Sequence, residues 1–332
     1  LCAENGVDGR VIGDPATSMP MGPQTPDTLS NLLAEIVRTD GGLLFDMRGS
    51  VGLIYRTRTS LYNQDPALEV DWEQLSPPSL PVLDDKNTRN DVTVRRRNGS
   101  SARAVRETGP LNVQDPAADP QGVGRYDTQV DVNPASDALL PDLAGWYLAL
   151  GTVDEQRFPA VTVDLDRSPE LAAAAAAVDV GDLIVVNDLP ADVSPDPVRL
   201  IVLGSEETIG SHRRTITFNC APASVYDVAV YDESRYASKR TYRHSSSGPI
   251  TTTQTGITFR SDVPWVTDPD QFPFDIMVSG ERMTVTAIGT AVQESDGEFR
   301  QLWTVIRSVN GVVKSHPVGV TVQLAEPPRY AL

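Results

Sequence analysis

The chain has 332 residues, of which 40% are hydrophobic and 22% are charged, an ordinary composition for a globular protein. This length predicts two domains and admits three, with enough apolar surface to fold without disulfide or metal staples. The formal net charge of −17 repels nucleic-acid backbones and anionic lipid surfaces, which excludes both as expected main partners.

The cysteines and the apolar segments predict no staple and no membrane anchor. Cys2 and Cys220 stand far apart and outside any CxxC or Cys/His spacing, which fits synthesis in a reducing compartment. The longest uninterrupted alanine-rich apolar segment, AAAAAAV at 172–178, is far shorter than the roughly 20 residues of a membrane span. The chain begins at Leu1 without a signal-peptide pattern, so we expect the start to lie inside a longer polypeptide.

The first predicted elements are a helix and a β-hairpin. Apolar residues at helical spacing predict a helix over 28–38, with Asp27 as N-cap and the Gly41–Gly42 pair as its end. Two strands are expected to follow at 43–47 and 51–59. The order helix, strand, strand is typical of a mixed α+β layer.

The middle of the chain alternates polar connections with short elements. Residues 61–91 are polar and proline-rich and predict extended surface connections. Asn98–Gly99 predicts a hairpin between strands 91–97 and 101–107. Helices are expected at 136–155 and 169–178, and further strands at 127–132, 160–166, 182–188, 198–207 and 213–221.

The C-terminal part predicts a separate all-β unit. We assign 1–230 to a first region of two packed subdomains, 231–256 to a polar linker and 257–332 to a small β domain. Its period-two strands are expected at 274–280, 281–289, 300–309 and 318–325. The fold class is therefore mainly β with a few helices (α+β), with β-barrel or sandwich domains and a small C-terminal barrel or sandwich.

The histidines do not sit in catalytic patterns. His212 precedes two arginines, His244 lies in the predicted linker, and His316 follows a hairpin expected at Asn310–Gly311. None has a GxSxG elbow or an HExxH pattern nearby, so we interpret all three as structural and His316 as a turn residue. We predict no catalytic residue, no cofactor and no metal site, and hence no enzyme. Cys220 is expected to be a small core residue.

Carboxylates and aromatic residues offer only weak binding signals. Asp164 and Asp166 point together on one strand, but chance neighbours are expected among 45 acidic residues. A tryptophan on a surface stacks on sugars, which makes Trp72, Trp265 and Trp303 candidates. Of these, Trp265 and Trp303 in the C-terminal unit are the possible contacts to a glycan or a protein partner.

Several segments, spread over nearly the whole length of the chain, resemble the sequences of one protein family. The segments are LLAEIVRTDGGLLFDMRGSVGLIYRTRTSLYNQDPAL (32–68), DDKNTRNDVTVRR (84–96), SSARAV (100–105), LPDLAGWYLALGTVDEQRFPAVTVDL (140–165), VGDLIVV (180–186), TITFNCAPAS (215–224), FPFDIMVSGERMTVTAI (272–288) and TVIRSVNGVVKSHPVGVTVQL (304–324). They resemble minor tail proteins encoded by phages of actinobacteria. These segments point to a family, but they contain no motif of an active site.

The resemblance implies a central hub of the tail tip in long-tailed phages. Such a hub is a ring, usually a homotrimer, that closes the tail tube and anchors tip components. Its implied partners are other copies of itself, the distal tail ring, the tape measure protein and receptor-binding proteins, and its implied location is the virion tail tip. Phage DNA would pass through without specific binding.

Two other functions remain open at this point. One is a carbohydrate-binding adhesin of the virion that contacts host cell-envelope glycan through Trp265 or Trp303. The other is a cell-wall hydrolase, for which zymography would show clearing. A hub from a tail-derived injection particle would have the same sequence signature as a virion hub.

Overall fold

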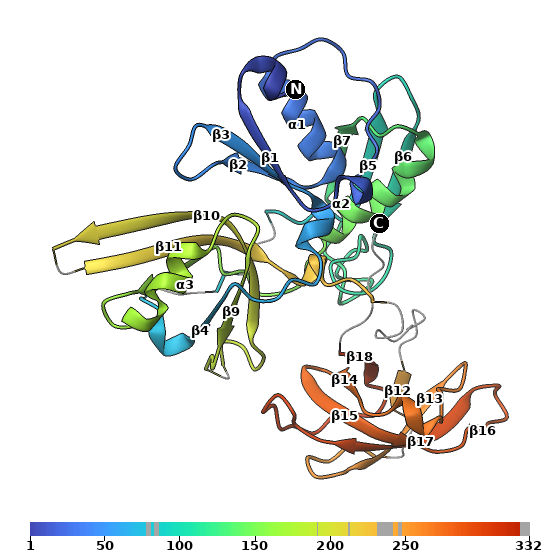
Figure 1. Ribbon diagram of the computed structural model, residues 1–332. Helices are drawn as coiled ribbons and strands as arrows, with labels where there is room; N and C mark the ends of the chain where they lie inside the picture. The colour runs from blue at the N-terminus through green and yellow to red at the C-terminus, as the bar shows by residue number, and fades with distance from the viewer. Residues whose placement is uncertain are drawn as a thin grey trace. The chain divides into compact units, whose positions relative to one another are not determined.

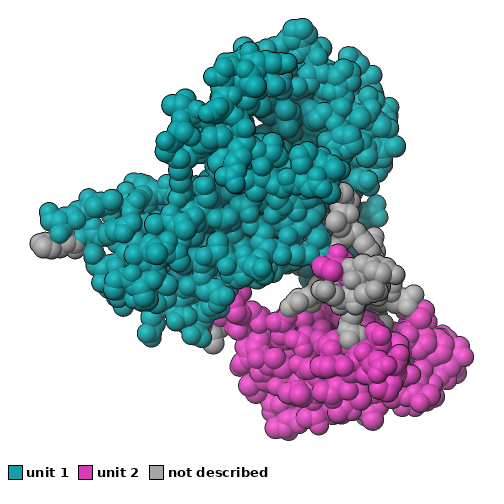
Figure 2. All heavy atoms as spheres, in the orientation of Figure 1, with its two compact units in different colours: residues 1–188, 198–228, 330–332 teal, residues 189–197, 229–329 magenta. Residues whose placement is uncertain are grey.

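The computed structural model describes residues 1–77, 81–82, 86–190, 192–211, 213–230, 242–244 and 248–325, the three residues at 242–244 by backbone only (Figure 1). The chain is mainly β, as predicted, with few helices. It divides into two units (Figure 2). The first holds Leu1–Asp188 and Val198–Val228, and the second holds Leu189–Pro197 and Ala229–Arg329. No helix among the described residues is both long and apolar enough to cross a membrane.

The N-terminal sheet has three strands beside one helix. Its order is β1 (Asp8–Ile12), β3 (Gly52–Arg56) and β2 (Leu43–Asp46), and the predicted hairpin of β2 and β3 is confirmed. Strand β1 was not predicted; it pairs in parallel with β3, and most of its side chains are exposed, so no alternation marks it.

Helix α1 (Leu29–Asp40) matches the predicted helix within two residues. Its N-cap is Thr28, whose side chain accepts from the Asn31 N–H, so the assignment to Asp27 was wrong by one position. Asp27 instead accepts from the Thr28 N–H and from the Asn31 side chain. Gly41 ends the helix with φ 80°, a left-handed conformation that favours glycine.

A second three-stranded sheet has the order β6 (Ser101–Val105), β5 (Asp91–Arg96) and β7 (Asp127–Val132). The hairpin at Asn98–Gly99 is confirmed, with Asn98 at φ 53°. Helix α2 (Leu140–Gly151) is shorter than predicted because residues 137–139 form a 3-10 turn. Val92, Val94 and Leu143 are fully buried in the core of this sheet and helix.

A five-stranded sheet completes the first unit. Its order is β4 (Leu68–Asp71), β9 (Leu183–Asn187), β10 (Val198–Gly210), β11 (Arg213–Pro222) and β8 (Ala160–Asp164). Strands β8 to β11 were predicted, but β4 lies in a segment expected to be an extended connection. The second helix of this region is short: α3 (Ala172–Ala177) follows a 3-10 turn at Pro169–Leu171.

The strands of the second unit pair in a closed cycle. The order is β13 (Gly256–Ser261), β12 (Tyr242–His244), β18 (Thr321–Leu324), β14 (Phe274–Val278), β15 (Glu281–Ile288), β17 (Phe299–Ile306) and β16 (Val292–Gln293), and β13 also pairs with β17. This extra pairing closes a small barrel. Strand β12 lies within 231–256, the segment expected to be a linker.

The hairpin predicted at Asn310–Gly311 does not form. Strand β17 already pairs with β15 on one side and β13 on the other, so no edge is open to the residues after Gly311. The chain therefore turns away, and His316 forms an isolated bridge with Ile250. His316 is 1% exposed, which corrects its interpretation as a turn residue.

Candidate functional site

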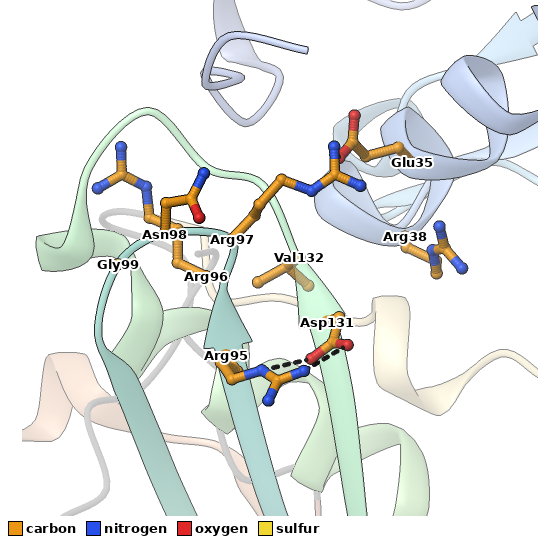
Figure 3. A pocket seen from close by; sticks show the side chains of 9 residues that line it. All are labelled: Glu35, Arg38, Arg95, Arg96, Arg97, Asn98, Gly99, Asp131 and Val132. Carbon is orange, nitrogen blue, oxygen red and sulfur yellow. Dashed lines mark hydrogen bonds and ion pairs between the residues drawn. The ribbon is translucent and has the colours of Figure 1, made fainter. Parts of the chain in front are cut away.

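The first unit contains an arginine-lined pocket of about 420 Å³ (Figure 3). We call it the arginine pocket. Its lining residues come from α1, from the end of β5 with the following turn, and from β7: Glu35, Arg38, Arg95, Arg96, Arg97, Asn98, Gly99, Asp131 and Val132. Four arginines and two carboxylates give this lining a positive formal charge within a strongly acidic chain.

The alternation of β5 places its arginines. Val92 and Val94 point into the core, so Arg95 and the following Arg97 lie on the opposite face of the sheet. Glu35 and Arg38 are three residues apart on α1 and therefore share one face of the helix. Figure 3 shows the arginines at the end of β5 across the pocket from these two helix residues.

The carboxylates of the pocket orient two of its arginines. Arg95 donates two hydrogen bonds to Asp131, from Nε and Nη2, each 2.9 Å long. Hydrogen bonding from Arg95 holds the pKa of Asp131 below its usual value, even though partial burial acts in the opposite direction. Arg97 donates to the Thr25 hydroxyl at 2.7 Å and lies 3.5 Å from a Glu35 oxygen.

The other two arginines behave differently from each other. Arg96 turns to the rim, where it donates to Asp137 at 3.0 Å and to the Ala135 carbonyl at 3.1 Å. Arg38 is exposed, and its guanidinium has no ion pair to any described residue. A guanidinium presents N–H donors in a planar fork that matches carboxylate or phosphate oxygens. The pocket is thus suited to bind an anionic group.

A second ionic cluster lies inside the barrel of the second unit. Arg307 donates to both oxygens of Glu281 at 2.7 Å, and the His316 Nε2 lies 2.6 Å from Glu281 Oε2. Ser308 adds hydrogen bonds from its N–H at 3.1 Å and its hydroxyl at 3.2 Å. The side chains of Glu281 and His316 are 0% and 1% exposed.

This buried cluster fastens separate segments of the chain to one another. Arg307 also donates to the carbonyl oxygens of Thr251, Gln254 and Lys314. Burial raises the pKa of Glu281, but the hydrogen bonds from Arg307 and His316 outweigh it and bring the pKa below its usual value. All oxygens of the carboxylate have partners, as a buried charge requires.

The two tryptophans proposed for glycan contact lie together in the barrel. Trp303 is 1% exposed and packs at 4.9 Å from Phe259 and 5.6 Å from Trp265, measured between ring centroids. Trp265 is half-buried and stacks on Phe274 at 5.5 Å. The structure therefore leaves no ring face of Trp303 open to a sugar, and one face of Trp265 is occupied.

The remaining candidate residues do not converge on a site. Burial raises the pKa of the Cys220 thiol to about 12, which opposes formation of a reactive thiolate. Asp164 accepts from the N–H groups of Asp166 and Arg167 within a turn, and Asp166 accepts from the N–H of Arg214 on β11, so both carboxylates bind backbone groups. His212 and the side chain of His244 lie outside the described residues.

No group of three or more His, Cys, Asp and Glu side chains within the described ranges is placed to hold a metal ion. The arginine pocket, with four arginines around one cavity, is therefore the candidate binding site.

The chain was compared with known proteins. No protein-family model matches it, and no curated protein matches it. Among solved structures, it is similar to the 43 kDa tail protein of prophage MuSo2 from Shewanella oneidensis, with 14% identity and a TM-score of 0.43, over 68% of this chain and 61% of that one. It is also similar to prophage tail protein gp18 from Listeria monocytogenes, with 12% identity and a TM-score of 0.39, over 65% of this chain and 60% of that one.

The chain thus aligns with less than two thirds of either solved structure.

Sequence reasoning missed both ionic clusters. The run Arg95–Arg97 was visible as part of a strand, and three consecutive arginines in an acidic chain are a usable signal. The contributions of α1 and β7 to the pocket were not visible, because Glu35 and Asp131 lie far from that run in sequence. Likewise, nothing local connects Glu281 with His316, which are separated by 35 positions.

Proposed function

We propose that this chain is a structural component of a phage tail tip, where copies form the central hub ring that closes the tail tube. The observation that carries the proposal is the sequence resemblance, which extends from residue 32 to residue 324 and so includes both units. In this role the ring anchors receptor-binding or other tip proteins and contacts the distal tail ring and the tape measure protein.

The β architecture supports an assembly role. Beyond Ile201, β10 pairs with β11 alone among the described strands, and residues 206–210 are exposed. Figure 1 shows the β10–β11 hairpin extending past the neighbouring strands. Ile209 near its tip is 72% exposed. A long hairpin with an unpaired edge and an exposed apolar tip suits contact with another polypeptide.

The charge of the chain suits the proposed channel. A strongly acidic ring repels the phosphate backbone of DNA, so the polymer passes without binding to its wall. The same repulsion acts between copies, which therefore need local contacts of opposite charge or apolar contacts to associate.

The proposal is tested by co-expressing the full chain with the tail tube, distal tail ring and tape measure proteins of the same genome. We expect the chain to co-purify with at least one of them and to form a homotrimer by native mass spectrometry. A monomer that binds none of these proteins would overturn the proposal.

The adhesin hypothesis is weaker on this structure, because Trp303 is buried and stacking would depend on Trp265 alone. A glycan array with the full chain and with Trp265→Ala separates the two functions. Glycan binding that is lost in the variant would favour the adhesin.

A further inference from the structure

We infer that the arginine pocket is one half of an interface between copies of this chain. The other half is a carboxylate row formed by Glu69, Asp71 and Glu73 on β4 and the 3-10 turn after it. This inference rests on the proposed function, which requires copies to associate, and it names the surfaces through which they do so.

The carboxylate row lies on an edge strand. Strand β4 pairs with β9 only, so its other edge has no strand neighbour in the described part of the chain. Leu68 and Val70 point into the core, whereas Glu69 and Asp71 are exposed. Glu73 is exposed as well, and none of the three carboxylates takes part in an ion pair with a described residue.

The spacing of the two surfaces agrees. Arg95 in β5 and Arg97 just after its end are two positions apart, and Glu69 and Asp71 are two positions apart on one face of β4. Both separations are about 6.6 Å along a strand. Because β5 has a strand on each edge, the row meets the arginines through side chains on the sheet face. Arg95 and Arg97 then face Glu69 and Asp71, and Arg38, which has no ion pair to a described residue, is available to Glu73.

The existing ion pairs of the pocket do not block such a contact. Arg95 and Asp131 are 56% and 62% exposed, and Arg97 is 47% exposed. Exposed ion pairs contribute little to stability, so their guanidinium groups can take a second carboxylate on a free N–H. The pocket lining also has more arginines than carboxylates, which leaves positive charge to be balanced by a partner.

Several other exposed carboxylates of the first unit are engaged in ion pairs or hydrogen bonds. Glu207 is paired with Arg214 at 2.8 Å, and Asp166 accepts from the Arg214 N–H. Asp115 and Asp119 accept hydrogen bonds within their own loop. In the row on β4, Glu69 accepts from Asn187 and Asp71 caps the 3-10 turn, but the row combines three exposed carboxylates, no described ion pair and a strand edge without a described strand neighbour.

A second copy is the occupant that fits these facts. The pocket belongs to the sheet of β5, β6 and β7, and the row belongs to the five-stranded sheet, so a copy carries both halves on separate sheets. An interface that joins two different patches is heterologous, and it forms a ring when the rotation between successive copies closes. This is the arrangement that the proposed hub requires.

The test is a charge exchange in the full-length chain, followed by sedimentation velocity at low ionic strength. Arg38→Glu with Arg95→Glu makes the pocket acidic, and Glu69→Lys with Glu73→Lys makes the row basic, while Asp71 is kept because it caps the 3-10 turn and Arg97 is kept opposite it. We expect each pair of changes to weaken association by at least about 100-fold. Combining all four changes in one chain should restore the association constant to within about tenfold of wild type.

The matched control is Arg167→Glu with Arg213→Glu, which reverses two exposed arginines outside the pocket. It should leave the association constant within about threefold of wild type, because charges outside an interface act on it only through screened long-range forces. Thermal unfolding of every variant checks that the fold is kept. If the glutamate variants unfold, Arg38→Gln with Arg95→Gln takes their place, and association must still fall at least tenfold.

The outcomes separate the inference from the proposed function. If wild type associates and the pocket variants associate equally well, the inference is wrong and the hub proposal stands. If the variant that carries all four substitutions is folded but fails to associate, the proposed pairing of the pocket with the row is wrong. If wild type is a monomer that still binds tail proteins, the inference fails while a role in the tail is kept. A wild-type monomer without such binding overturns both.

Discussion

The arginine pocket of the first unit and the buried cluster of the second use the same pair of groups at opposite degrees of burial. In both, one arginine makes two hydrogen bonds to one carboxylate, at 2.9 Å for Arg95 with Asp131 and at 2.7 Å for Arg307 with Glu281. The first pair is 56% and 62% exposed, and the second is 6% and 0% exposed.

This difference separates a structural pair from one available for binding. Removing two charges from water is costly, so the buried pair is kept only with every remaining donor and acceptor satisfied, here by Ser308, His316 and backbone carbonyls. The exposed pair remains hydrated and contributes little to folding. Its arginine is therefore available to a partner, whereas Arg307 is committed to the fold.

The largest effect is expected for Arg307→Met. The change leaves Glu281 buried without its cation and should lower the free energy of unfolding by about 3–5 kcal/mol. Urea denaturation monitored by tryptophan fluorescence measures it, because Trp265 and Trp303 lie in the same barrel. A loss below about 1 kcal/mol would show that the buried pair does not stabilise the barrel.

His316→Gln should have an intermediate effect. Removing the imidazole leaves one Glu281 oxygen with fewer partners, but Arg307 remains bound to the carboxylate. We expect a loss of about 1–3 kcal/mol in the same denaturation experiment, as for other buried hydrogen-bond partners. A variant as stable as wild type would mean that His316 only fills space.

The pH dependence of stability should differ between wild type and Glu281→Gln. The pKa of Glu281 is depressed in the folded state, so its contribution is present above the usual value of 4.5 and is lost as pH falls through the folded pKa. Wild type should therefore lose more stability than the variant between about pH 5 and pH 3. If the free energy of unfolding fell equally steeply with pH in wild type and in Glu281→Gln, the assigned role of the carboxylate would be contradicted.

The smallest effect is expected for Arg95→Gln. Its pair with Asp131 is exposed, so unfolding free energy should change by no more than about 1 kcal/mol and less at high salt. The same urea denaturation detects this change. A loss comparable with that of Arg307→Met would remove the distinction between the two clusters.

The sequence predicted the elements whose pattern is local. Helix α1, the β5–β6 hairpin and strands β14, β15, β17 and β18 of the barrel have clear periodicity or a turn at Asn98–Gly99, whereas β12, β13 and β16 of the barrel were not predicted. Strand β1 was missed because nearly all of its side chains are exposed, so they show no alternation. Strand β4 was missed because it has only four residues and lies in a proline-rich segment. Both are held by parallel pairing to strands distant in sequence, which no local pattern reveals.

The candidate sites were less predictable than the fold for the same reason. Trp303 was considered as a surface aromatic because alternation alone does not reveal which face of β17 is buried. The hairpin at Asn310–Gly311 was predicted from a turn signal, but β17 already has neighbours on both edges. His316 therefore left the expected turn and joined Glu281 in the interior.

The most direct test of the central claim is an electron cryo-microscopy map of the intact phage particle with this chain located in it. The account predicts a closed ring of copies around the tail axis at the tip, with β4 of each copy facing the Arg95–Arg97 segment of its neighbour. A chain found as an isolated appendage away from the axis, or absent from the tail, would contradict it.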